Sequence, residues 1–258
     1  MPSRDKNPVR AGQNDMTIRV DPPSIHRRVE DLRQRYEGRA GLALLRPIIE
    51  DEFPDQVALA CSFGAESAVL LHMVASVNSA TPVIFLNTGK LFDETLAYRD
   101  QLIERLGLSA VRNVSPSLDD LTAHDPGGEL FQSDPDRCCF IRKVAPLTRV
   151  LGDYSVWITG RKAYQGGLRA FLPTIEAVDR RIKINPIVGW NREQVRAYFD
   201  RHDLPHHPLE ADGFLSIGCA PCTERTADAT DLRAGRWRGC NRTECGIHSP
   251  YRRAERME

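Results

Sequence analysis

The chain has 258 residues, seven of them cysteine, and equal numbers of acidic and basic side chains, so its formal net charge is zero. This length is enough for one large hydrophobic core, whereas the neutral charge argues against a protein that wraps nucleic acid. No apolar run approaches the ~18 residues of a membrane span, and the first residues lack the apolar core of a signal peptide. We therefore expect a cytoplasmic protein with reduced thiols, bound to neither nucleic acid nor a membrane.

The first part of the chain predicts a loose lead followed by helices. Residues 1–21 are polar and rich in Pro, Asn and Arg, so we expect a disordered lead. Apolar residues then recur at helical spacing between Ile25 and Leu45, which predicts one or two helices that cover a core. Residues 57–60 form a short apolar run typical of a buried parallel strand, and a helical pattern follows through Val74.

Residues 61–67, Cys-Ser-Phe-Gly-Ala-Glu-Ser, join that strand to that helix. A loop of small residues at the start of a helix can bind phosphate, because its backbone N–H groups and the helix N-terminus attract anions. The hydroxyls of Ser62 and Ser67 would be further donors. An ordinary tight turn with a capping serine explains the pattern equally well, and the loop lacks the Gly-Lys-Ser/Thr of a Walker A sequence.

Strands and helices alternate along the rest of the chain. Further strands are predicted at residues 83–86, 110–114, 156–159 and 182–185. Helices are predicted from near Asp93, from Cys138 and from Asn191, where Gln194 completes a capping box, and residues 115–136 are expected to be turns. The alternation predicts an α/β fold with an open parallel sheet flanked by helices, and residues 160–165 should face a ligand at the end of a strand.

Two cysteine pairs supply four soft ligands: Cys138-Cys139 and Cys219-Ala-Pro-Cys222. Zinc sites are built from cysteines separated by two to four residues, and only the second pair has that spacing. Adjacent thiolates suit a cluster better, because each can bind its own iron, so we favour a [4Fe–4S] cluster. Disulfides or buried free thiols remain alternatives.

The histidines of the chain give a weaker signal for metal than the cysteines. His202, His206 and His207 follow the last predicted helix, but no second set of ligands has a matching spacing. We interpret them as surface or packing histidines.

The end of the chain is strongly basic. Six arginines lie between Arg233 and Arg253 against one acid, Glu244, and Trp237 lies between two of them. Guanidinium groups beside an aromatic ring suit a nucleotide, although a solvated basic tail explains the charge alone equally well. Cys245 follows in a setting of arginines and His248, which favours a thiolate, and the alternative is an ordinary exposed thiol.

These motifs together resemble one family, the assimilatory adenylyl-sulfate and phosphoadenylyl-sulfate reductases. Residues 62–67 look like the family's version of the PP-loop, the two cysteine pairs like its cluster ligands, and Arg236-Trp237 with Glu244-Cys-Gly-Ile-His248 like its catalytic tail. The resemblance covers residues 57–248 with four separate motifs in order. It implies a PP-loop (adenine nucleotide alpha hydrolase-like) α/β fold.

The resemblance also implies roles for particular residues. Cys245 and His248 would be catalytic, and a cluster would be bound by Cys138, Cys139, Cys219 and Cys222. The substrate would be bound by Ser62, Phe63, Gly64, Ser67, Lys143, Gly160, Lys162, Arg169 and Arg236. Arg238 has no firm family counterpart, but we expect its charge to contribute with that of Arg236. Lys162 stands where the family usually has arginine, and lysine lacks the bidentate fork. Cys240 matches no family cysteine and is close enough in sequence to Cys245 for a disulfide.

The implied division of the chain is a lead at 1–21, a reductase domain with an iron-sulfur site at 22–232 and a catalytic tail at 233–258. The implied reaction is attack of the Cys245 thiolate on the sulfur of adenosine 5'-phosphosulfate, which releases AMP and leaves an S-sulfocysteine. A separate thioredoxin or glutaredoxin would then release sulfite. We expect a homo-oligomer.

Other functions remain open. Members with both cysteine pairs generally prefer adenylyl sulfate, but some accept the 3'-phosphorylated nucleotide as well. An ATP-dependent adenylating or tRNA-thiolating PP-loop enzyme would share the loop and the cysteines, although it commonly has Asp where this chain has Glu66. An iron-sulfur regulator that binds DNA fits less well with the neutral charge.

Overall fold

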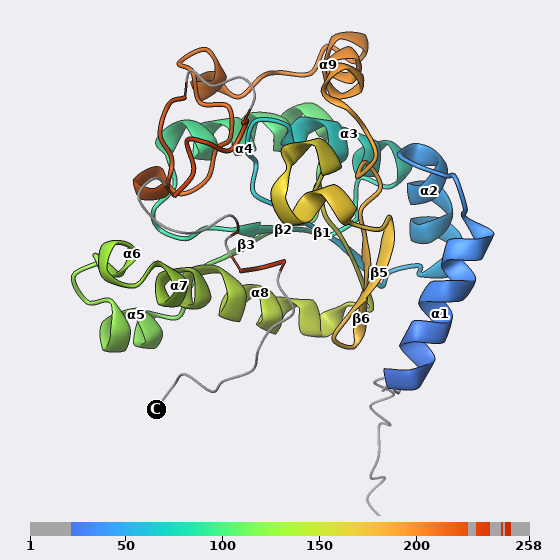
Figure 1. Ribbon diagram of the computed structural model, residues 1–258, viewed down its shortest axis with the longest axis horizontal. Helices are drawn as coiled ribbons and strands as arrows, with labels where there is room; N and C mark the ends of the chain where they lie inside the picture. The colour runs from blue at the N-terminus through green and yellow to red at the C-terminus, as the bar shows by residue number, and fades with distance from the viewer. Residues whose placement is uncertain (1–21, 227–230, 238–243, 245, 249–258) are drawn as a thin grey trace, which may run out of the picture.

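The computed structural model describes residues 22–226, 231–237, 244 and 246–248 (Figure 1). The predicted lead at 1–21 and the candidate site residues Arg238, Cys240 and Cys245 lie outside the described residues. A six-stranded sheet has the order β3-β2-β1-β4-β6-β5. Its strands are β1 (Val57–Cys61), β2 (Val83–Leu86), β3 (Val111–Val114), β4 (Val156–Ile158), β5 (Ile175–Val178) and β6 (Arg181–Ile184).

Five strands run parallel, as the alternation of strands and helices predicts. β1 pairs with β2 on one side and with β4 on the other, so the chain reverses its direction of travel across the sheet between β1 and β4. Such a reversal leaves a crevice at the carboxyl ends of the two strands, where ligands of open α/β sheets bind.

The edge strand β5 differs from the prediction, since it runs antiparallel to β6. A two-residue turn joins the two strands, and Asp179 in this turn adopts a left-handed backbone with φ 54°. The sequence gives no Gly or Asn signal for such a turn, and β5 has only four residues. These two properties explain why sequence patterns did not reveal the hairpin.

Helices cover both faces of the sheet (Figure 1). The helices are α1 (Pro22–Arg35), α2 (Leu42–Pro47), α3 (Ser67–Val77), α4 (Asp93–Leu106), α5 (Leu118–His124), α6 (Leu130–Ser133), α7 (Pro135–Cys139), α8 (Ala145–Val150) and α9 (Arg192–Arg201). α3 and α4 lie on one face and α8 on the other, while α1 packs against the β5–β6 hairpin. No helix of the described residues is both long enough and apolar enough to span a bilayer.

The hydrophobic core is built around the helix α3 and the strand β1. Six residues of α3 are buried, and the central strand β1 is buried on both faces from Val57 to Leu59. A smaller apolar cluster on the opposite face joins Trp157 of β4 to Leu147 and Leu151. Because both faces of the sheet are covered, its strands β1, β2 and β4 form nearly continuous apolar runs.

Residues 115–136, where turns were predicted, contain the short helices α5 and α6 and the start of α7 between non-helical residues, because some of the turn residues cap these helices. Ser117 accepts a hydrogen bond from the Asp120 backbone N–H and begins α5, and Asp134 accepts one from the Arg137 N–H at 2.9 Å and begins α7. Pro135 lies in the first turn of α7, a favourable position for proline. A π-helix (Phe140–Val144) connects α7 to α8.

The capping box predicted at Asn191 is confirmed, and it gives a test of local stability. The Asn191 side chain accepts from the Gln194 N–H at 2.8 Å, and the Gln194 side chain accepts from the Asn191 N–H at 2.8 Å. Asn191→Ala should lower the free energy of unfolding by ~1 kcal/mol, measured by urea titration. Gln101→Ala, at an exposed position of α4, is the control; an equal loss in both variants would contradict the role of the cap.

Candidate active site

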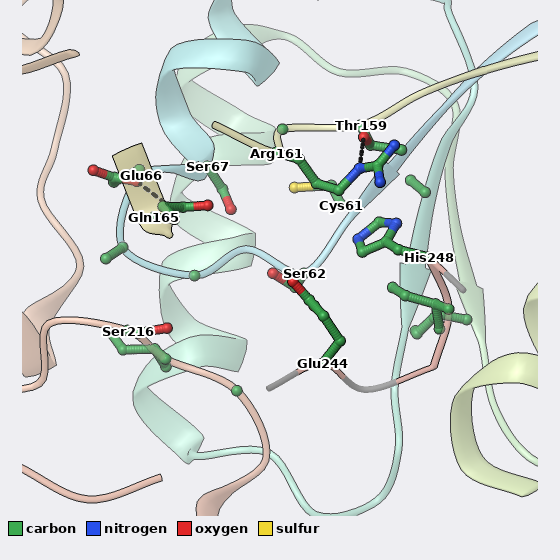
Figure 2. A pocket seen from close by; sticks show the side chains of 18 of the residues that line it. Cys61, Ser62, Glu66, Ser67, Thr159, Arg161, Gln165, Ser216, Glu244 and His248 are labelled. Carbon is green, nitrogen blue, oxygen red and sulfur yellow. Dashed lines mark hydrogen bonds between the residues drawn. The ribbon is translucent and has the colours of Figure 1, made fainter. Parts of the chain in front are cut away.

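A cavity of about 210 Å³ opens at the carboxyl ends of β1 and β4 (Figure 2). The loop after β1 contributes Ser62, Gly64, Glu66 and Ser67 to its lining. The loop after β4, the segment 215–219 and the described part of the tail complete it. The cavity therefore lies at the crevice that the strand order predicts.

The shape of the loop after β1 depends on Phe63 and Gly64. Phe63 has a left-handed φ of 49°, and its side chain is fully buried in edge contact with Phe85, with ring centroids 5.3 Å apart. Phe63 was predicted to bind substrate, but its side chain does not line the cavity and instead anchors the loop in the core. A Cβ atom at Gly64 would lie 3.1 Å from the Ile217 carbonyl oxygen, so a side chain there would require that segment to shift.

Lys162 lies in the cavity wall and is paired with the loop after β1. Its ammonium is 3.0 Å from Oε2 of Glu66. The same oxygen accepts from the Gln165 amide at 3.0 Å, and Oε1 of Glu66 accepts from the Tyr164 hydroxyl. Burial alone would raise the pKa of Glu66, but the charge of Lys162 and these hydrogen bonds lower it. Glu66 is therefore a charged group that positions Lys162.

Arg161 also lines the cavity, and the sequence analysis did not select it. Its guanidinium donates to the Asn185 side-chain oxygen at 3.0 Å, to Thr159 at 3.3 Å and to Glu176 of β5. The only sequence signal was its place directly after Gly160 in the loop that follows β4. Its partner Glu176 lies on β5, which was not predicted, so no sequence pattern indicated that Arg161 is held in a fixed position.

The described part of the tail reaches the cavity through charged contacts. Glu244 accepts from Arg169 at 2.9 Å and lies 3.5 Å from Arg233. Burial disfavours its charge, but the hydrogen bond and charge of Arg169 and the charge of Arg233 lower its pKa. Arg233, which the sequence analysis counted but did not select, thus joins Arg169 in holding the tail.

His248, which is part of the tail, packs beside Trp157, with ring centroids 6.0 Å apart and 18° between the ring planes. Its Nδ1 is buried without a hydrogen-bond partner among the described residues. Burial, followed by the charges of Arg161 and Lys183, lowers the pKa of His248 well below its usual value. The imidazole is therefore neutral at pH 7.

The four candidate ligand cysteines line a second, small cavity next to the first. Cys138 and Cys139 come from α7, and Cys219 and Cys222 come from the distant segment around residue 220. All four are free thiols, so the disulfide alternative does not occur among them. The described residues contain no group of three or more His, Cys, Asp or Glu side chains arranged for a single metal ion.

The pKa values of the thiols depend on one another and on a nearby lysine. Burial and then the neighbouring Cys139 raise the pKa of Cys138 to about 11. At Cys219 burial is outweighed by the charge of Lys143 and a hydrogen bond with Thr88 at 3.2 Å, which lower its pKa. Lys143 lines both cavities and thus lies between the cysteines and the candidate substrate site.

Most of the remaining predicted site residues line the first cavity, namely Ser62, Gly64, Ser67, Gly160, Arg169 and Arg236. The three histidines interpreted as surface or packing residues, His202, His206 and His207, pack against Tyr198, Phe199 and Tyr98, respectively, and are not in the lining of either cavity.

The fold and the cavity define an α/β protein with a cationic ligand site at the switch point of a parallel sheet and a cysteine cluster beside it. Residues 56–225 match the phosphoadenosine phosphosulfate reductase domain, and the chain belongs to this family.

Similar proteins agree with this assignment. The chain is 49% identical to an adenosine 5'-phosphosulfate reductase of Chelativorans sp. (strain BNC1), over 85% of this chain and 90% of the relative. It is 40% identical to a phosphoadenosine 5'-phosphosulfate reductase of Gloeobacter violaceus, over 86% of this chain and 93% of the relative. The fold matches a phosphoadenylyl-sulfate (PAPS) reductase crystal structure from Candida auris with a TM-score of 0.66 at 23% identity, over 80% of this chain and 99% of that chain.

The lowered pKa of His248 predicts how the tail responds to acid. A released tail would take up a proton near pH ~6.5, whereas the packed imidazole resists protonation, so packing should weaken as the pH falls below ~6.5. Glu244, with its lowered pKa, stays charged in this range. We expect hydrogen exchange of residues 244–248 to accelerate as the pH is lowered from 7.5 to 5.5. The rates are corrected for the general pH dependence of exchange with a β1 peptide as the internal reference. His248→Gln should show little of this change, and an equal acceleration in that variant would contradict the prediction.

Proposed function

We propose that this protein reduces adenosine 5'-phosphosulfate to sulfite and AMP in sulfate assimilation, with thioredoxin or glutaredoxin as electron donor. The observation that carries the proposal is that Glu244 and His248, on either side of position 245 in the sequence, line the same cavity as the loop after β1. The 49% identity to a protein named adenosine 5'-phosphosulfate reductase supports the choice of substrate.

The proposed chemistry has two steps. The Cys245 thiolate attacks the substrate sulfur, so that a sulfur–sulfur bond forms, the bond from sulfur to the phosphate oxygen breaks, and its electron pair leaves with AMP. One thiolate of the donor then attacks the Cys245 sulfur and expels sulfite. The second donor thiol resolves the mixed disulfide, which leaves the donor oxidised by two electrons and Cys245 reduced.

The cavity suits an anionic ligand. Its lining includes the cationic side chains Lys143, Arg161, Lys162, Arg169, Arg233 and Arg236. Fixed cations in a largely buried site stabilise the charge that gathers as a thiolate approaches a phosphosulfate. The neutral His248, whose Nδ1 has no partner among the described residues, is available to exchange a proton near the tail.

We also propose that Cys138, Cys139, Cys219 and Cys222 bind a [4Fe–4S] cluster, since four free thiols from two distant segments line one cavity. When bound, the cluster would link the two segments and add a fixed charge distribution beside Lys143. Members of the family that carry both cysteine pairs generally prefer adenylyl sulfate. The 3'-phosphorylated nucleotide remains the second candidate because of the Gloeobacter relative's name. A cytoplasmic homo-oligomer remains our expectation.

Intact-protein mass spectrometry after anaerobic incubation with adenylyl sulfate, without thioredoxin, tests the proposed reaction. The wild type should gain the mass of one sulfo group, and Cys245→Ala should not. Thioredoxin and its reductant should then remove the adduct and release sulfite. A wild-type protein that retains its iron yet forms no adduct with either nucleotide would exclude the reductase mechanism, and pyrophosphate release from ATP would then favour an adenylating enzyme.

The cluster has its own test in iron and sulfide content. Cys219→Ser should lose most of the bound iron and the visible absorbance of the anaerobically purified protein, because one of four thiolate ligands is missing. Cys61→Ser is the matched control, since Cys61 is a free thiol that lines the first cavity and not the second. Equal iron in both variants would contradict the proposed ligand set.

A further inference from the structure

A row of three side chains crosses the sheet on one face. Trp157 of β4 is the register partner of Lys183 of β6, which is the register partner of Glu176 of β5. Residues directly opposite one another on paired strands share a face of the sheet. Trp157 belongs to the apolar cluster against which Ile247 of the tail packs, so the row lies on the face that the tail contacts.

Lys183 is buried in this row without a hydrogen-bond acceptor. Its side chain is 0% exposed, and its ammonium has no hydrogen-bond partner among the described residues. The Glu176 carboxylate lies 3.9 Å away, and the Trp157 ring centroid lies 4.4 Å away. A buried ammonium is usually paired more closely than this, because burial disfavours its charge.

Lys183 shares its nearest carboxylate with a second buried cation. Glu176 lies near both Lys183 and Arg161, and it contacts Arg161 more closely. Asp179 also acts on Lys183, and Glu244 also acts on Arg161. Burial, followed by the charge of Arg161, lowers the pKa of Lys183 to about 8. The ammonium is therefore still mostly charged at pH 7, and Lys183 is a buried cation in this row.

The tail packs on the same tryptophan ring. His248 stacks beside Trp157, and its Nδ1 is buried and unpartnered among the described residues. Lys183 is one of the charges that act most strongly on the His248 imidazole. This buried cation is thus next to the part of the tail that, under the proposed function, carries the nucleophile.

We propose that Lys183 is a positioning residue for the sulfo transfer: its ammonium holds the Trp157 ring on which His248 packs, and it adds a buried positive charge beside the tail. The inference rests on the proposed function. A thiolate and a phosphosulfate are both anions, so a fixed positive potential lowers the free energy of the transition state more than that of the separate reactants. Lys183 does not line the first cavity, so it should support the rate of the reaction more than nucleotide binding.

Lys183→Met tests this role, because Met has a similar length and no charge. Replacing an incompletely paired buried cation by an apolar side chain should leave the Tm unchanged or raise it. The rate of S-sulfo adduct formation at saturating adenylyl sulfate should fall by about tenfold or more, while the Kd for AMP should change by less than about threefold. The pH profile of Cys245 alkylation, followed by peptide mass spectrometry, should move to higher pH.

Two further variants complete the experiment. Lys183→Arg keeps the charge and should recover part of the lost rate and of the shifted pH profile. Arg181→Met is the matched control, since Arg181 lies two residues away on β6, is partly exposed and donates to the Leu151 carbonyl oxygen. It should retain the wild-type rate of adduct formation.

The outcomes separate this inference from the proposed function. A Lys183→Met protein that has lost thermal stability but forms adduct at the wild-type rate per folded molecule would overturn the inference, as would an equal slowing in Arg181→Met. A parallel loss of Tm and rate, with an unchanged alkylation profile, would also overturn it, because it indicates a structural role. If the wild type forms no adduct, the proposed function itself fails.

Discussion

Three partly buried carboxylates hold three cations of the cavity in position. Glu66 pairs with Lys162, Glu176 with Arg161, and Glu244 with Arg169. Like charges at short range repel strongly in a partly buried site, so such a set of cations requires partners that are fixed in advance. The remaining architecture supplies these partners from three different places, namely the loop after β1, the edge strand β5 and the tail.

The contact between Glu244 and Arg169 connects the tail to the body of the protein. Arg169 lies on a short 3-10 helix (Gly167–Phe171) after β4, and Arg233, the first residue of the tail, approaches the same carboxylate. Ile247 and His248 add apolar and stacking contacts on the other side of position 245. Polar and apolar contacts therefore act together, and both should be needed to hold the tail at the cavity.

The cysteine site depends on the same construction. A buried pair of Arg142 with Asp125 joins the π-helix after α7 to the preceding loop, and Arg142 also donates to the Thr88 carbonyl oxygen at 2.8 Å. Thr88 in turn contacts Cys219. The segments that carry the two cysteine pairs are thus already close together through protein contacts, and Lys143 extends from the same π-helix to the first cavity.

Much of the fold could be predicted from local patterns. The apolar runs at β1, β2 and β4, the capping box at Asn191 and the loop after β1 each follow from residues that are neighbours in sequence. The spacing of the cysteines and the motif around Cys245 likewise pointed to the family that the comparisons show. These features are carried by short stretches, in which residue type and spacing fix the local structure.

The tertiary structure decided what depends on pairing between distant segments. The antiparallel hairpin of β5 and β6 brings Glu176 to Arg161 and Lys183, and the register of β4 with β6 sets Lys183 against Trp157. The left-handed backbone of Phe63 accompanies a side chain that lies in the core instead of the cavity. No local pattern encodes strand register across a sheet, because it is fixed by which faces become buried when the strands assemble.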